Sequence, residues 1–168
     1  RLLHELLREY SKDEKEYRAY VQSLKNSVLT AFYTPEPVVT AMQESLQVPG
    51  IRPGRFLDPS AGTGMFISGL KGVPEVHCFE KDKLTGKILL YPESRVAIDG
   101  FQSIQPYYNN YFDMVSSNIP FGNTRVYDRD FDRSEDVVRK SSLAAVHNYF
   151  FLKGMDTLHE GGILAYIT

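Results

Sequence analysis

The fold of this chain is indicated most clearly by residues 55–64, Arg55-Phe56-Leu57-Asp58-Pro59-Ser60-Ala61-Gly62-Thr63-Gly64. Residues 55–58 are a short apolar run that ends on an acid, and residues 64–70 continue with the spacing of a helix. The proline ends the run, and the two glycines permit a tight turn and a close approach of the backbone to a ligand. The sequence therefore predicts a buried strand, a glycine-rich turn and a helix in succession, the repeating unit of α/β folds.

Short apolar runs alternate with helical segments along the rest of the chain. We expect strands at 75–79, 94–98, 112–117 and 163–167, and helices at 82–90 and 142–159. This alternation is typical of a mostly parallel sheet with helices on both faces. We predict a Rossmann-like sheet in the order 3-2-1-4-5, with a ligand crevice between the first and fourth strands. Because the sequence stops inside an apolar run, we also expect a fragment truncated before the last strands of the sheet.

Two domains are predicted. Residues 1–30 form an N-terminal helical extension, in which Ser11-Lys12-Asp13-Glu14 fits a capping box that restarts the helix. Residues 31–168 form the larger domain. Its first helix is expected to have Thr34 as its N-cap and Pro35 at its first position, where the missing N–H costs nothing.

Composition narrows the classes of protein. The chain has 168 residues, of which 42% are apolar and 24% charged, so a packed core is expected and global disorder is not. There is no transmembrane run and no secretory signal, which predicts a cytoplasmic protein without a membrane partner. The single cysteine excludes a disulfide framework, and the four histidines lack metal-ligand spacing, so we expect no metal. A net charge of −2 argues against nucleic-acid binding by bulk positive charge alone.

Polar residues follow four of the predicted strands. They are Asp58, Glu80, Asp99 and Asn118. Because the carboxyl ends of parallel strands meet at one edge of the sheet, these side chains are expected to converge on one crevice. The glycine turn fits neither a P-loop, which needs Gly-Lys-Ser/Thr, nor a dinucleotide fingerprint, whose third glycine is replaced by Ile67. An acid at the first strand end suits a ligand that carries an amino group and no phosphate.

Three motifs together resemble a known family. Residues 31–35 (Ala-Phe-Tyr-Thr-Pro), residues 58–64 (Asp-Pro-Ser-Ala-Gly-Thr-Gly) and residues 118–121 (Asn-Ile-Pro-Phe) are similar to motifs of the S-adenosylmethionine-dependent N6-adenine DNA methyltransferases. Their order resembles that of the modification subunits of type I restriction enzymes, and the likeness covers 31–168. The charged helical start is also similar to methylase segments of large methylase–helicase proteins on bacterial mobile elements.

The resemblance implies which residues bind S-adenosylmethionine. They are Tyr33, Thr34, Pro35, Asp58, Ser60, Gly62, Gly64, Glu80, Asp99 and Phe101. Residues 33–35 would close over the methionine end, and Asp58 with the glycine turn would hold the amino-acid part. Glu80 would bind the ribose hydroxyls, Asp99 the adenine, and Phe101 would contact the adenine ring.

The resemblance also implies a target pocket made by Asn118, Ile119, Pro120 and Phe121. The Asn118 side-chain oxygen and the Ile119 carbonyl would each accept a hydrogen bond from the adenine amine, whose lone pair then points at the methyl group. Phe121 would stack on a base rotated out of the DNA. The family usually has a proline where Ile119 stands, so we expect more backbone freedom there. DNA and further domains of a longer chain are the implied partners.

Alternatives remain from the sequence. A methyltransferase of the same fold could act on a protein glutamine amide or an RNA amine, and a non-catalytic module could dock DNA. Cys78 lies inside a predicted strand and is expected to be buried, not a thiolate nucleophile. Residues 122–141 are expected to form a long loop of mixed charge, or alternatively a loop that folds over DNA.

Overall fold

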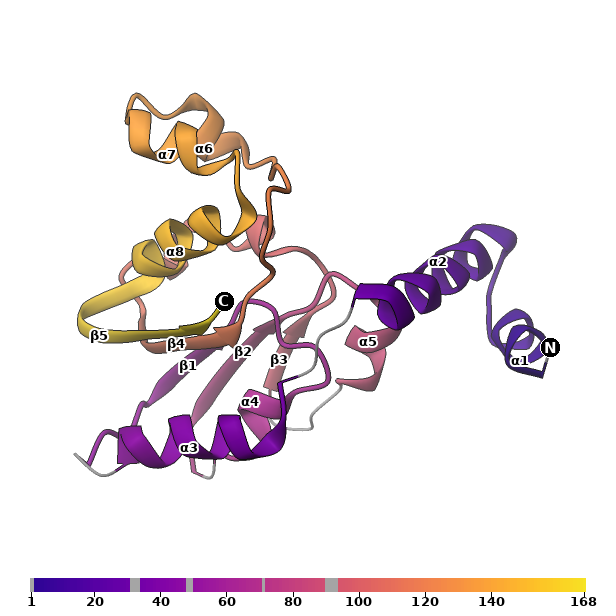
Figure 1. The fold of residues 1–168 in the computed structure, drawn as a ribbon, viewed down its shortest axis with the longest axis horizontal. Coiled ribbons are helices and arrows are strands. Elements are labelled where there is room, and N and C mark those ends of the chain that lie inside the picture. Colours follow the sequence, from indigo (N-terminus) through magenta and orange to yellow (C-terminus); the bar gives the residue numbers. More distant parts are fainter. Residues whose placement is uncertain (1, 31–33, 48–49, 71, 90–93) are drawn as a thin grey trace.

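The computed structural model describes residues 2–30, 34–47, 50–70, 72–89 and 94–168 (Figure 1). Within them, no helix is long and apolar enough to cross a membrane.

The centre of the fold is a five-stranded sheet in the order β3-β2-β1-β4-β5, which confirms the predicted order. The strands are β1 (Arg55–Asp58), β2 (Glu75–Phe79), β3 (Ser94–Ala97), β4 (Phe112–Asn118) and β5 (Leu158–Ile167). All four neighbouring pairs are parallel. The register pairs Asp58 with Cys78 and Leu57 with Val115, so the end of β1 lies between the ends of β2 and β4.

Helices cover both faces of the sheet, as the sequence predicts (Figure 1). On one face lie α3 (Glu36–Gln47), α4 (Met65–Ser68) and α5 (Lys83–Ile88), and on the other lies α8 (Val146–Thr157). Two buried clusters match these faces: Val39, Phe66 and Met114 belong to one, and Val115 and Tyr149 to the other. Met114 and its neighbour Val115 belong to different clusters, because successive side chains of a strand point to opposite faces.

Several predicted boundaries are wrong by a few residues. The helix predicted at 142–159 is observed at 146–157, and β5 begins at Leu158 instead of residue 163. The early part of β5 pairs Leu158 with Phe112, and a register shift follows before Met114 pairs with Ile163. Gly161, with φ of 84°, lies in this irregular part, where an alternating apolar pattern is lost.

The N-terminal extension consists of α1 (Leu2–Glu9) and α2 (Glu14–Thr30), which project from the α5 side of the sheet (Figure 1). The capping box is real but shifted by two residues. The Glu16 N–H donates to Asp13 Oδ1 at 2.7 Å, and the Glu16 carboxylate accepts from the Lys12 N–H at 2.7 Å. Asp13 therefore caps α2, while the Ser11 hydroxyl donates to the Leu7 carbonyl.

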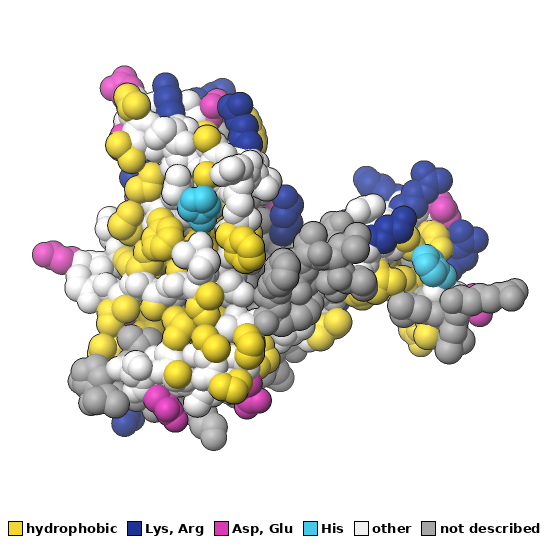
Figure 2. All heavy atoms as spheres, in the orientation of Figure 1, with side chains coloured by type: hydrophobic (Ala, Val, Ile, Leu, Met, Phe, Trp, Pro, Cys, Tyr) yellow, Lys and Arg dark blue, Asp and Glu magenta, His cyan; other side chains and the backbone are white. Residues whose placement is uncertain are grey.

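The predicted loop at 122–141 is wrong, because it contains two short helices, α6 (Arg129–Arg133) and α7 (Val137–Ser142). Asp128 accepts from the Asp130 and Phe131 N–H groups and so caps α6, and Asp136 caps α7. Side chains of both charges cover this part of the surface, as they do the α1–α2 extension (Figure 2). The prediction of a surface of mixed charge was therefore correct, whereas the prediction of a loop backbone was wrong.

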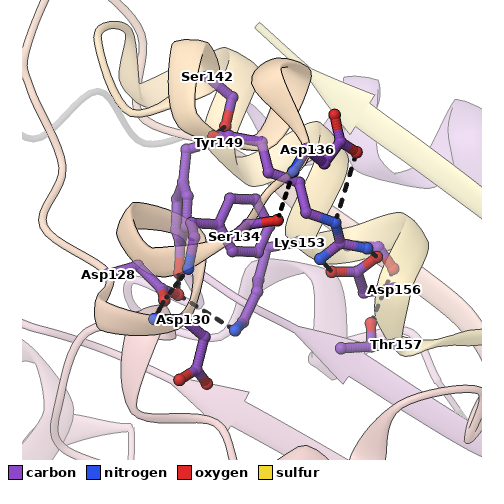
Figure 3. Close-up of polar contacts among 12 residues, drawn as sticks. Asp128, Asp130, Ser134, Asp136, Ser142, Tyr149, Lys153, Asp156 and Thr157 are labelled. Carbon is purple, nitrogen blue, oxygen red and sulfur yellow. Dashed lines mark hydrogen bonds and ion pairs between the residues drawn. The ribbon is translucent and has the colours of Figure 1, made fainter.

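A buried polar cluster holds these two helices on α8 (Figure 3). Asp128 Oδ2 accepts from the Tyr149 hydroxyl at 2.6 Å and lies 3.1 Å from Lys153 Nζ. Asp128, Tyr149 and Lys153 are 4%, 0% and 7% exposed. Nearer the surface, the Arg139 guanidinium of α7 binds both oxygens of Asp156 on α8. The segment that follows residues 118–121 is therefore fixed to the sheet domain through α8.

Removing the buried ammonium should destabilise the fold measurably. We expect Lys153→Met to lower the free energy of unfolding by about 2 kcal/mol, since Asp128 then keeps its hydroxyl and backbone donors but not its counter-charge. Lys140→Met, at an exposed position of α7, is the matched control and should change it by less than about 0.5 kcal/mol. Urea unfolding followed by circular dichroism measures both, and equal midpoints would contradict the expectation.

Candidate active site

Asp58 ends β1 in the middle of the sheet and is fully buried. Its Oδ1 accepts hydrogen bonds from the Ser117 hydroxyl at 2.6 Å and from the Ser60 N–H at 3.1 Å. Its Oδ2 has no hydrogen-bond partner among the described residues. Burial raises the pKa of Asp58 to about 7, against the lowering effect of the two hydrogen bonds. A buried carboxylate oxygen without a partner is costly unless a ligand supplies a donor.

The glycine turn follows Asp58 directly and is held by its neighbours. Gly62 and Gly64 have φ of 55° and 86°, the left-handed region that glycine tolerates without strain. A Cβ on Gly64 would lie 2.7 Å from Leu89 Cδ1, so a side chain there would force Leu89 to move. The Ala61 N–H donates to the Phe79 carbonyl at 2.9 Å, which fixes the turn beside the end of β2.

Glu80 follows β2 and faces the same turn. Its Oε2 accepts from the Gly62 N–H at 2.8 Å, and its Oε1 accepts from the Asp82 N–H at 2.7 Å. Burial raises the pKa of Glu80 above its ordinary value, although both backbone hydrogen bonds act in the other direction. Each oxygen keeps a further lone pair that can accept a ligand hydroxyl.

Two predicted site residues follow β3: Asp99, which is exposed, and Phe101, which is buried. Asp99 is exposed, and its Oδ1 accepts from the Gly100 N–H at 2.7 Å. Phe101 is only 1% exposed and packs on Phe79 and Phe150, with ring centroids 5.8 and 5.4 Å apart. Phe101 is thus a core residue in this structure, and the expected contact of its ring with a cofactor has no exposed surface to form on.

Ser117 links the end of β1 to the end of β4. Its hydroxyl donates to Asp58 Oδ1, lies 3.3 Å from the Ser60 carbonyl, and is fully buried. Ser117 was not among the predicted site residues, although a serine inside a predicted buried strand could have indicated a polar role. Asn118 comes next and ends β4, partly buried. Positions 58, 80 and 118 therefore share one edge of the sheet.

Ile119 is fixed more firmly than the sequence suggests. Its N–H donates to the Ile167 carbonyl at 3.0 Å, and its side chain is 1% exposed in the core. A proline could not make this hydrogen bond, because it has no N–H. The added backbone freedom expected from isoleucine is offset by these two contacts. Pro120 is exposed, and the Phe121 side chain is 54% exposed.

The Thr34-Pro35 motif opens α3, one residue later than predicted. The Val38 N–H donates to the Pro35 carbonyl at 3.0 Å, so Pro35 precedes the first helical residue, Glu36. The Thr34 side chain is 8% exposed. Tyr33, the third residue expected to cover a cofactor, lies outside the described residues.

Two other expectations concern reactive and metal-binding groups. Cys78 is completely buried in β2, which confirms the packing role, and burial raises the pKa of its thiol. Among the residues that the structure describes, no cluster of three or more His, Cys, Asp and Glu side chains is arranged to hold a metal ion.

The sheet order β3-β2-β1-β4-β5 matches the Rossmann-like fold of solved methyltransferase structures. A modification subunit of a candidate type I restriction enzyme from Vibrio vulnificus shares this fold with a TM-score of 0.60 and 18% identity, over 90% of this chain and 37% of that one. A candidate RNA methyltransferase from Pyrococcus horikoshii shares it with a TM-score of 0.56 and 23% identity, over 87% and 70%.

In sequence, the chain is 31% identical over 147 residues to the protein named Defense against restriction protein B of Escherichia phage P1. The match covers 83% of this chain, but the chain spans only about 6% of that relative's length. No family model matches the chain.

Proposed function

We propose that this chain is the S-adenosylmethionine-binding catalytic part of a methyltransferase that acts on the N6 amine of adenine in DNA. The observation that carries the proposal is the buried Oδ2 of Asp58. It has no partner among the described residues and lies beside a glycine turn. Asn118 ends β4, the strand that pairs directly with the strand of Asp58.

The residues at this edge fit the proposed cofactor. Its ammonium group needs a buried acceptor, which Asp58 Oδ2 offers, and its ribose hydroxyls need an acceptor such as Glu80. Gly62 and Gly64 carry no side chains, so a ligand can approach the backbone of the turn at these two positions. Ser60, Asp99, Thr34 and Pro35 stay proposed contacts, with Tyr33 beside them in sequence.

The tetrapeptide 118–121 is proposed to activate the target amine. When bound, the cofactor supplies a methyl group on a sulfonium sulfur. The Asn118 side-chain oxygen and the Ile119 carbonyl accept the two hydrogens of the amine, which draws its lone pair out of the aromatic ring. Pro120 holds the turn, and the exposed ring of Phe121 stacks on the extruded base.

Two comparisons support DNA as the target. One structural neighbour is the modification subunit of a candidate restriction enzyme, and the sequence relative is named for defence against restriction. RNA is the second candidate, because another neighbour is a candidate RNA methyltransferase. Because the chain has a net charge of −2, most of the positive charge that binds the phosphates of nucleic acid is proposed to come from further domains of a longer protein.

A substrate comparison tests the proposal. The full-length protein that contains this chain is incubated with radiolabelled S-adenosylmethionine and duplex DNA, structured RNA or cell protein. We expect label in DNA, recovered as N6-methyladenine, and none when every adenine is replaced by 2-aminopurine. Label in RNA or protein would contradict DNA as the substrate and assign the methyltransferase to that other substrate class. Cofactor binding without transfer to any substrate would indicate a non-catalytic module.

The raised pKa of Asp58 predicts how cofactor binding depends on pH. The ammonium needs the ionised carboxylate, and with a pKa of about 7 only about a tenth is ionised at pH 6. The dissociation constant for S-adenosylhomocysteine should therefore rise about 10-fold from pH 8 to pH 6. Calorimetry at both values measures it, and a constant affinity would contradict the assignment.

Without ligand the same shift acts on stability. The folded state raises the pKa of Asp58 above its ordinary value of 3.8, so it binds this proton more tightly than the unfolded chain. The contribution of Asp58 to stability is therefore present at low pH and falls as the pH rises from about 4 to about 7.

A further inference from the structure

The helical extension is hydrogen-bonded to the loop that carries Glu80. Ser23 of α2 is 5% exposed, and its hydroxyl donates to Asp82 Oδ1 at 2.5 Å. The same hydroxyl accepts from the Leu84 N–H at 3.1 Å. These bonds join residues 59 and 61 positions apart in the sequence, so they fix α2 to the start of α5.

From Asp82 the contacts continue into the candidate site. The Asp82 N–H donates to one oxygen of Glu80, and the Gly62 N–H donates to the other. Asp82 Oδ1 also accepts from Thr85 N and Oγ1 at 2.9 and 2.8 Å, which makes it the N-cap of α5. One continuous set of hydrogen bonds thus runs from α2 through Asp82 and Glu80 to the glycine turn.

A second set of contacts packs α2 against α5. Lys87 lies 3.4 Å from Glu16 Oε1, and its ammonium is 4.6 Å from the centre of the Tyr20 ring. Tyr20 is 4% exposed, and its hydroxyl donates to Glu16 at 2.8 Å. The face of α2 toward α5 is therefore packed along more than one turn.

We propose that α2 belongs to the cofactor site, with Ser23 as a positioning residue that sets the Glu80 carboxylate for the two ribose hydroxyls. The proposal rests on the proposed function. Ser23 touches no ligand itself and acts through Asp82, which orients the backbone N–H that holds Glu80 Oε1. Loss of the Ser23 hydroxyl leaves the two Thr85 donors on Asp82, so α5 stays capped while the Glu80 loop loses its outer support.

The test compares two ligands on the full-length protein. One is S-adenosylhomocysteine, and the other is its analogue without the two ribose hydroxyls. Ser23→Ala should weaken the first about 3- to 10-fold, the range for one lost hydrogen bond, and the second less than about 2-fold. Ser45→Ala is the matched control, because its hydroxyl donates to the Ala41 carbonyl of its own helix. It should change neither affinity.

A second variant, Lys87→Met, tests the same proposal if Ser23→Ala does not fold. Lys87 has a side chain 51% exposed, so Lys87→Met should fold, and it removes the Lys87 contacts with Glu16 and Tyr20 that hold α2 against α5. It should weaken S-adenosylhomocysteine at least about 2-fold and spare the analogue. Equal losses for both ligands, or no loss in either variant, would overturn the positioning role. A wild-type protein that binds neither ligand would overturn the proposed function as well.

Discussion

Replacing Asn118 by alanine is expected to lower the rate of methyl transfer about 10²- to 10³-fold while the affinity for S-adenosylhomocysteine stays within about 2-fold. The Asn118 side chain is proposed to accept a hydrogen from the target amine, an interaction that strengthens only as the amine becomes nucleophilic. The cofactor contacts proposed for Asp58 and Glu80 come from other strands, so they should survive the change.

Single-turnover transfer of labelled methyl groups to adenine-containing DNA measures this effect. Asn148→Ala, on the exposed surface of α8, is the matched control and should keep the wild-type rate. An Asn118→Ala enzyme that remains fully active would show that the amine is activated elsewhere. A parallel loss of cofactor binding would instead place Asn118 in the cofactor pocket.

The second large effect concerns Asp58. We expect Asp58→Asn to weaken S-adenosylhomocysteine at pH 8 by about 30-fold or more, which is the usual cost of removing one partner from a buried charge pair. The asparagine can still accept from the Ser117 hydroxyl and the Ser60 N–H, so the turn should keep its shape. The variant should also lose the pH dependence of binding between pH 6 and pH 8.

Calorimetry of the variant across this pH range provides the measurement. Asp130→Asn, an exposed acid on α6, controls for the loss of one negative charge. Because a desolvated charge disappears, Asp58→Asn should be at least as stable to urea at pH 8 as the wild type. Wild-type affinity in the variant would exclude Asp58 as the acceptor of the ammonium.

Local patterns were enough to predict the sheet. The strand before the glycine turn and the strand at 75–79 were predicted at their observed bounds, because each is a short stretch with apolar residues that a polar residue ends or follows. Their order was predicted from the Rossmann-like fold class that this alternation of strands and helices indicates. The convergence of positions 58, 80 and 118 followed from the same geometry.

The rest depends on short elements and distant contacts. Helices α6 and α7 have five and six residues, too few to show the hydrophobic periodicity of a helix. Asp128 and Asp136 could nevertheless have been recognised as N-cap residues from the sequence. Lys153 lies four residues after Tyr149 on the buried side of α8, where its ammonium pairs with Asp128 and lies over the Phe131 ring. The link from Ser23 to Asp82 joins segments far apart in the chain, so no local pattern reveals it.

The bond between the Asp58 carboxylate and the Ser117 hydroxyl spans 59 residues. Such a contact can form only after β1 and β4 have paired, and pairings of high contact order are slow because loop closure costs entropy before any bond repays it. Asp58, the proposed acceptor for the cofactor ammonium, and the strand that ends in the proposed target tetrapeptide are thus assembled in one late event. Recovery of ligand binding during refolding should consequently lag behind the return of helical signal.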